Sequence, residues 1–360
     1  MRPYNVEIFT QGFMMVGNTN VNEIIYKEDY LSSDENSIII TAMPGIKKQD
    51  YIRISRGKEE YAGVISEVTY GTDSSKKLQQ ISFKPLMELL NTDVLFDVNL
   101  QGVGTFESFI CDRIQEMFLH NEDNLQNIKG LTVSVVSGTT DWGLHITPAE
   151  KGGHYNIVNL LNSIIIPAMT KYGILVKTEL DVQNRQVNFK VGRMTGNEIV
   201  IESDLPNIIK KSITIKSVSA DVNKLVLLDA NDYTTKRVYY LHPDLGYDTK
   251  NEDRITPVIC EMQSLSYEEG SSFESAAIQA AYDKFANLAY SNLIELTMMK
   301  GDSLVKPEEM EFGQVVNIIS EGVSYQSILT GREIGNETKL IFGTVRLDLT
   351  KILRRNEDGR

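Results

Sequence analysis

Cysteine is scarce in this chain, with only Cys111 and Cys260 among 360 residues. Two cysteines cannot build the disulfide framework on which small secreted domains depend. Cys111 falls in a helical pattern and Cys260 in a strand pattern. Because free cysteine is among the most buried residue types, both are predicted to be core residues.

Long apolar runs are missing as well. The longest, 38–40 and 164–169, fall far short of the roughly 20 residues that cross a bilayer. The first 13 residues contain no apolar stretch followed by a small-residue cleavage site. The sequence therefore predicts no membrane insertion by this chain, and synthesis and assembly in the cytoplasm.

Positive charge is outweighed, with 36 Lys and Arg against 49 Asp and Glu and a net charge of -13. A nucleic-acid reader needs Lys and Arg clustered on one face to contact phosphates. The densest basic group, Lys351, Arg354 and Arg355, is followed at once by Glu357 and Asp358, and is typical of a helix C-terminus. Specific nucleic-acid binding is therefore excluded.

Catalytic motifs are also missing. The sequence contains no H-E-x-x-H, G-x-S-x-G or G-x-x-x-x-G-K-[ST] motif. The spacing of the four histidines matches no zinc pattern: His120, His145, His154 and His242. We expect no catalytic residue, no metal site, no cofactor and no enzymatic activity.

Two alternatives remain. Cys111 with His145 could begin a Cys/His peptidoglycan hydrolase, although an apolar helix face disfavours the thiolate that such an enzyme needs. Exposed aromatic residues could instead form a carbohydrate- or receptor-binding site, with Tyr239, Tyr240, Tyr247 and Trp142 as candidates.

The first hundred residues alternate apolar and polar positions in short runs separated by turn residues, which predicts antiparallel strands. The expected strands are 6–9, 23–26, 37–42, 51–55, 61–70 and 78–83. Strands this short and this numerous indicate a small β-barrel or sandwich over residues 1–100, and we expect the β-barrel.

Residues 101–205 predict an α+β domain. Apolar residues at helical spacing follow Thr105, which is placed to cap the helix N-terminus. A strand over 131–137 comes next, then a helix from about 156 that ends at Pro167. A hairpin of strands 174–180 and 187–193 completes the domain.

Residues 206–360 return to strand patterns. The expected strands are 213–218, 225–228, 237–241, 258–262, 292–298, 315–320, 324–331 and 339–342. A helix over about 272–292, which opens with a capping pattern at Ser271 to Glu274, interrupts them. This region is interpreted as a second β-barrel with a helical insertion over about 264–292.

An internal repeat links the two barrels. Residues 50–70 align without a gap with residues 314–334, so that Tyr61 matches Tyr325, 264 positions later. Each copy reads as strand, glycine-containing turn and strand, although any two hairpins share this alternation. The residues predicted to form equivalent barrel cores are Ile52, Ile54, Tyr61 and Val64 in the first copy, and Val316, Ile318, Tyr325 and Ile328 in the second.

Four segments resemble the tail-hub proteins of tailed phages, the baseplate-hub family with its siphophage relatives. They are YAGVISEV at 61–68, DLPNIIKKSITIKSVSADVNKLVLLDAND at 204–232, KGDSLVKPEEMEFGQVVNIISEGVSYQSILTGREI at 300–334 and LIFGTVRLDLTKILRR at 340–355. The resemblance in order and local pattern covers nearly the whole chain. It implies a β-rich α+β fold: two similar small β-barrels with an α+β domain between them.

The resemblance also implies a structural virion protein at the tail tip. Such a hub is a homotrimer around a channel, in which two barrels from each of three subunits make a pseudo-sixfold ring. Its expected partners are the tail tube or distal tail protein above, the tape-measure protein inside, and a spike or fibre below. DNA would pass during genome ejection without specific binding, and an acidic lining would repel its phosphates. Because the sequence ends at Arg360, lytic or fibre domains are expected on another polypeptide.

Overall fold

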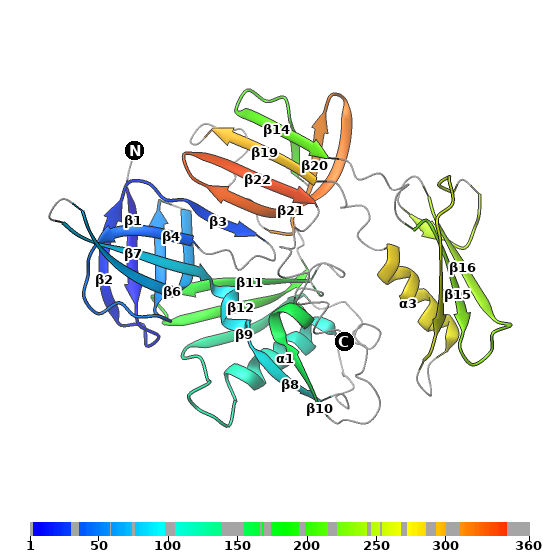
Figure 1. Cartoon of the computed structure of the whole chain (residues 1–360), viewed down its shortest axis with the longest axis horizontal. Helices are drawn as coiled ribbons and strands as arrows, with labels where there is room; N and C mark the ends of the chain where they lie inside the picture. The colour runs from blue at the N-terminus through cyan, green and yellow to red at the C-terminus, as the bar shows by residue number, and fades with distance from the viewer. Residues whose placement is uncertain are drawn as a thin grey trace.

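A computed structural model of the chain describes residues 3–29, 36–57, 59–73, 76–97, 105–137, 155–165, 168, 174–193, 199–214, 222–242, 246–252, 254–267, 272–285, 293–299, 310 and 312–343. Within these ranges the strands form five sheets, accompanied by a few short helices (Figure 1). The β-rich α+β fold class predicted from the sequence is confirmed.

The N-terminal sheet has six strands in the order β2-β1-β5-β6-β7-β4, and every neighbouring pair is antiparallel. Its strands are β1 (Tyr4–Phe9), β2 (Met15–Val21), β4 (Asn36–Thr41), β5 (Tyr51–Arg56), β6 (Glu59–Asp73) and β7 (Lys76–Pro85). Alternation decides the facing, since Ile38 and Ile40 in β4 are buried while Ile39 between them is 61% exposed. Most buried side chains of β1, β4, β5, β6 and β7 form one core, whereas Phe9, Tyr51 and Val64 pack with buried residues of 86–191.

The C-terminal sheet has seven strands, six of them in the order β13-β20-β21-β22-β19-β14. Their bounds are β13 (Ile199–Glu202), β14 (Ile208–Thr214), β19 (Leu293–Met299), β20 (Val315–Ser320), β21 (Val323–Ile334) and β22 (Glu337–Gly343). The seventh strand, β3 (Tyr26–Asp29), comes from the N-terminal part of the chain and pairs with β21. Strands β13 and β14 are the first and the last in this order, yet only residues 203–207 separate them in sequence. The two ends of the sheet are therefore close together, and the sheet curls back on itself.

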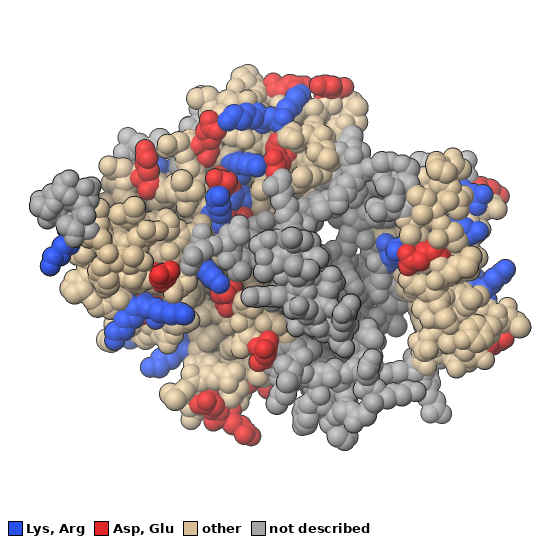
Figure 2. Space-filling model, viewed as in Figure 1, with Lys and Arg blue, Asp and Glu red and all other residues tan. Residues whose placement is uncertain are grey.

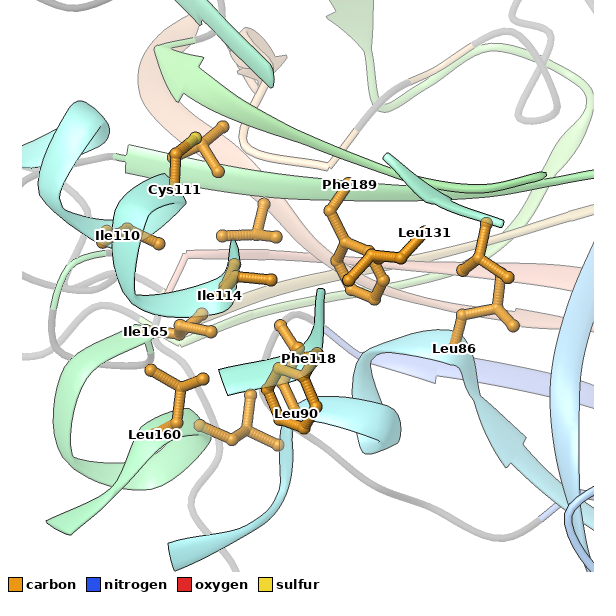
Figure 3. Close-up of a cluster of buried hydrophobic side chains, with 14 of the residues drawn as sticks. Leu86, Leu90, Ile110, Cys111, Ile114, Phe118, Leu131, Leu160, Ile165 and Phe189 are labelled. Carbon is orange, nitrogen blue, oxygen red and sulfur yellow. The ribbon is translucent and has the colours of Figure 1, made fainter. Parts of the chain in front are cut away.

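The central α+β region lies between these two sheets in sequence. Its elements are the 3₁₀ helix η1 (Leu86–Leu90), β8 (Asp93–Asp97), α1 (Phe106–Phe118), β9 (Leu131–Ser137), β10 (Tyr155–Asn159), the π-helix η2 (Leu160–Ile165), β11 (Ile174–Asp181) and β12 (Gln186–Arg193). Thr105 caps α1 as predicted, because its hydroxyl accepts a hydrogen bond from the Ser108 N–H at 3.3 Å. The helix face formed by Ile110, Ile114 and Phe118 packs on β9, β12, η1 and η2 (Figure 3).

The helix predicted from residue 156 begins later than expected. Residues 155–159 form β10, which pairs with β8, and only then does the chain coil into η2. The consecutive β-branched residues Ile157 and Val158 favour the strand. The four apolar residues that follow, Leu160, Leu161, Ile164 and Ile165, are buried as their spacing predicted.

The segment between β14 and β19 carries a sheet of its own, in the order β17-β16-β15-β18. Its strands are β15 (Lys224–Asp229), β16 (Lys236–Leu241), β17 (Tyr247–Asp248) and β18 (Cys260–Leu265), and its helix is α3 (Phe273–Phe285). Phe273, Ala277, Ala281 and Phe285 of α3 cover Leu225, Leu227, Tyr239 and Leu241. Within the described ranges, no helix is long and apolar enough to cross a membrane.

The prediction that both cysteines are core residues is wrong for one of them. Cys111 on α1 is 4% exposed, whereas Cys260 is exposed on the edge strand β18. The next residue, Glu261, points toward α3 and forms a salt bridge with Lys284 at 2.6 Å. Because side chains alternate along a strand, Cys260 points to the opposite face, which α3 does not cover.

Candidate functional site

Where the structure describes them, the candidate residues of the two alternatives do not form a catalytic or ligand-binding site. Burial, and then Asp112 and Glu107, raises the pKa of the Cys111 thiol to about 12, so it is the opposite of an activated nucleophile. His145, its candidate partner, lies outside the described residues. The described part of the chain contains no group of three His, Cys, Asp or Glu side chains that could hold a metal ion.

Of the four aromatic candidates for carbohydrate binding, three lie in the described part of the chain and one lies outside it. Tyr239 is 7% exposed and packs under α3, which leaves it unavailable to a ligand. Tyr240 is half-buried, with the Arg254 guanidinium 5.6 Å from its ring centre. Tyr247 packs against Phe285 at 5.3 Å, and Trp142 lies outside the described residues. The described aromatics therefore serve mainly as packing groups.

The residues of the internal repeat lie in the two large sheets. Ile52, Ile54, Val316 and Ile318 are at most 1% exposed, Tyr61 and Val64 are each 5% exposed, and Tyr325 and Ile328 are half-buried. The first four point into the cores of their own sheets, the N-terminal and the C-terminal respectively.

The two hairpins have the same register. In β5–β6, Ile54 lies opposite Tyr61. In β20–β21, Ile318 lies opposite Tyr325, and each member is 264 positions later in the sequence. Both turns contain a glycine with positive φ, Gly57 at 65° and Gly322 at 78°. Residues other than glycine rarely adopt this backbone conformation.

The equivalence continues beyond the hairpins. The pairing with the third strand shifts register between Ile65 and Glu67 in β6, and between Leu329 and Gly331 in β21, again 264 positions apart. A fourth strand follows in each sheet, giving the orders β5-β6-β7-β4 and β20-β21-β22-β19. A shared irregularity at one position is not a general property of hairpins, so it favours duplication over chance similarity.

Strand β3 joins the two sheets. The sequence predicted a strand over 23–26 inside the first barrel, but the strand forms over Tyr26–Asp29 and pairs with β21 of the C-terminal sheet. Tyr26 lies opposite Ile334, and Glu28 lies opposite Arg332. Local alternation gives a strand but carries no information about which sheet it joins, so this junction could not be found from the sequence.

Arg332 and Glu28 form the ion pair at the centre of this junction. Nη2 and Nε of Arg332 donate to Oε2 of Glu28 at 2.7 and 3.1 Å, and the two side chains are only 15% and 25% exposed. The guanidinium also lies 5.0 Å from the ring centre of Phe312 and 6.0 Å from that of Tyr61. Burial lowers the pKa of Arg332, but the carboxylate of Glu28 and, to a smaller extent, Tyr26 and Tyr61 outweigh this effect, so the pKa is raised and the guanidinium stays charged.

Apolar contacts cross the same junction. The rings of Tyr26 and Tyr61 are 4.5 Å apart, and Phe83 stacks on Tyr26 at 6.2 Å. Ile334 belongs to the C-terminal sheet but is 3% exposed and packs in the core of the N-terminal sheet. The two sheets therefore share buried side chains, which fixes their relative position more firmly than surface contacts would.

A groove of about 680 Å³ lies beside the junction and is lined by residues 23–25, which precede β3, and by residues of the C-terminal sheet and its turns. Its charged residues carry both signs: Glu23, Lys210, Lys211, Glu295, Glu333, Glu337 and Lys339. Lys210 pairs with Glu337 and Lys339 with Glu295, so these charges neutralise one another. On the face of the molecule that Figure 2 shows, basic and acidic side chains of the described residues are also interspersed, unlike the basic face of a nucleic-acid reader.

The buried phenols of Tyr26, Tyr51 and Tyr61 and the buried thiol of Cys111 predict alkaline sensitivity. Burial raises the pKa of Tyr51 to about 12, as it does for Cys111, and raises the pKa of Tyr26 and Tyr61 as well. Ordinary values in an unfolded chain are about 8.5 for Cys and about 10 for Tyr. As the pH rises, the unfolded chain therefore loses these protons first, and stability that is complete below about pH 8.5 is lost above it.

We expect the urea midpoint, followed by circular dichroism, to fall steadily between about pH 8.5 and 11. Replacement of Cys111 by Ala should flatten the part of this fall that begins near pH 8.5. An unchanged midpoint across the range would contradict the assignment of these side chains to the core.

Comparison with known proteins supports the fold only through solved structures. No protein-family model matches the sequence, and no curated protein matches it. The tail protein from Neisseria meningitidis MC58 superposes with a TM-score of 0.58 at 12% identity, over 95% of this chain and 96% of that one. The 43 kDa tail protein of prophage MuSo2 from Shewanella oneidensis gives 0.56 at 12% identity, over 95% and 98%.

The prophage tail protein gp18 from Listeria monocytogenes EGD-e gives a TM-score of 0.51 at 10% identity and covers 98% of both chains. Such low identity establishes a shared fold and nothing finer. Since the match spans nearly the full length of each protein, the chain has the fold of tail proteins. The resemblance to tail-hub proteins predicted from the sequence is confirmed at this level.

Proposed function

We propose that this chain, which has the fold of tail proteins, is a structural subunit of a tail tip: a hub that closes the tail tube and opens a channel for DNA. The observation that carries the proposal is that two sheets of one chain contain hairpins with the same strand register, β5–β6 and β20–β21. Strand β3 connects these two sheets. A protein with two equivalent units can contact a sixfold partner with three copies. The proposed role is mechanical and requires no catalytic group.

In the assembly that we propose, three copies form a ring in the virion. The two barrels are built on the N-terminal and the C-terminal sheet, and the central α+β region lies between them in sequence. The tail tube or distal tail protein binds above, the tape-measure protein inside, and a spike or fibre below. A net charge of -13 favours passage of DNA, because carboxylates repel phosphate and leave no strong binding sites along the channel.

Electron microscopy of tails that contain this chain tests the proposal. We expect three copies at the tip with threefold symmetry, each burying about 2,000 Å² or more against its neighbours, as obligate interfaces do. Isolated protein can be monomeric without contradicting this expectation, because the tail can template the ring. A sixfold ring of this chain, or a single copy, would refute the assignment.

A further inference from the structure

The junction inside the chain brings together two unlike surfaces. The first is the segment Gly331–Ile334, which is the part of β21 beyond its register shift. On the side opposite β22 this segment pairs with β3 and not with β20, and we call that side the edge of the C-terminal sheet. The second is the surface that receives this edge, which consists of β3 and of Tyr61 of the N-terminal sheet. A contact between unlike surfaces of two equivalent units is head to tail, so each unit should carry both surfaces.

The N-terminal sheet carries the corresponding edge, Glu67–Tyr70 of β6. Positions 67 and 70 correspond to 331 and 334, because the two register shifts are 264 positions apart. Strand β7 pairs with one side of this edge. On the other side, pairing with β5 ends at Tyr51 opposite Val64, and no described strand takes its place.

Exposure distinguishes the two edges. Ile334 is 3% exposed because the N-terminal sheet receives it, whereas its counterpart Tyr70 is 64% exposed. The adjoining Gly71 has open space where a side chain would begin. In Figure 1 the β6–β7 hairpin extends to the left, away from the C-terminal sheet, so the C-terminal sheet of the same chain does not cover it.

Unpaired backbone and an exposed tyrosine beside it form a surface suited to strand pairing. The open side of an edge strand presents N–H and C=O groups ready to bond another chain. Tyrosine adds a large apolar ring with a polar end, which is why it is enriched in interfaces. The ion pair is not repeated, since Val68 stands where Arg332 stands in the other sheet.

We propose that the Glu67–Tyr70 edge docks on the C-terminal sheet of a second copy of this chain, in the manner of the junction within the chain. Tyr70 packs there beside Tyr325, the half-buried counterpart of Tyr61. Each copy then offers one edge and one receiving surface, and in the threefold arrangement that we propose, repetition of this head-to-tail contact closes a ring. The inference deepens the proposed function and rests on it, because it identifies the contact between subunits.

Photo-crosslinking in tail particles that contain this chain tests the contact. Benzoylphenylalanine is placed at position 70, and in a control at Tyr233, which is 69% exposed on the turn between β15 and β16. We expect the probe at 70 to join two copies through a peptide within 293–343, and the probe at 233 to give no such product. Three copies per particle with crosslinks elsewhere, or none, would overturn the inference and leave the proposed function standing. One copy or six would overturn both.

A substitution gives an independent readout. Because Tyr70 is exposed, Tyr70→Lys should leave the circular dichroism spectrum unchanged while reducing the yield of complete particles by about tenfold or more, as loss of an interface hot spot does. Tyr233→Lys should have no effect on yield. Normal assembly of the Tyr70→Lys protein would overturn the inference.

Discussion

Replacement of Ile318 by Asp should prevent the C-terminal sheet from folding. Ile318 is 0% exposed and lies in the core with Leu296, Val316 and Leu340. A carboxylate at this position would have no cation or donor, and burying an unpaired charge costs several kcal/mol, about 4 or more. Since domains are stable by only about 5–15 kcal/mol, we expect the protein to lose its native circular dichroism signal or to be insoluble.

The same hairpin supplies the matched control. Val323 is 50% exposed at the start of β21, so Val323→Asp should change the unfolding free energy by less than about 0.5 kcal/mol. Ile54→Asp should have the same effect on the N-terminal sheet as Ile318→Asp has on the C-terminal one, because Ile54 is 1% exposed at the corresponding position. A soluble, cooperatively folded Ile318→Asp protein would show that this strand does not face the core.

Removal of the cation at the junction should loosen the contact between the two sheets. Arg332→Leu leaves the carboxylate of Glu28 with no charged partner in a site where it is only 25% exposed. We expect a loss of about 2–3 kcal/mol, somewhat less than for a fully buried pair. The local readout is hydrogen exchange, which should become faster at the amides of β3 and of residues 331–334.

The neighbouring ion pair on the same two strands is the control. Lys27 and Glu333 are 4.0 Å apart, and their side chains are 50% and 43% exposed, so Glu333→Leu should cost less than about 0.5 kcal/mol. In a double-mutant cycle, Glu28→Leu combined with Arg332→Leu should recover part of the loss, because no charge is then left unpaired. Equal effects at both ion pairs, or no recovery, would contradict a special role for Arg332.

Structural elements that depend on residues close together in the sequence could be predicted. The cap at Thr105, strand β9 and the two hairpins follow from side-chain spacing and from glycines in turns, and the structure contains them. Strand β2 was missed, because MVGNTNV is largely polar and offers no apolar alternation to recognise. None of its residues is buried, which is why a strand can form there without that pattern.

The junction was beyond sequence reasoning for a different reason. The alternation around Tyr26 indicates a strand, but the choice of partner depends on Ile334 and Arg332, about 300 residues away. The repeat could be recognised because both hairpins keep the same alternation of apolar and polar residues. The sheet that β3 joins, in contrast, has no effect on the residues next to β3 in the sequence. The same limit explains why Cys260 was assigned to the core: the strand was predicted, but not the face that α3 covers.

The pairing of β3 with β21 also sets the order of events during synthesis. Glu28 and Arg332 are 304 positions apart, and at ~5–20 residues per second the ribosome needs roughly 15–60 s to travel between them. During that interval the N-terminal core lacks Ile334, and the C-terminal sheet does not yet exist. A nascent chain released before this point would lack β21, the strand with which Tyr26 and Glu28 pair. Because long-range strand pairing is slow, closure of the junction should be the last step by which a newly made chain becomes competent to assemble.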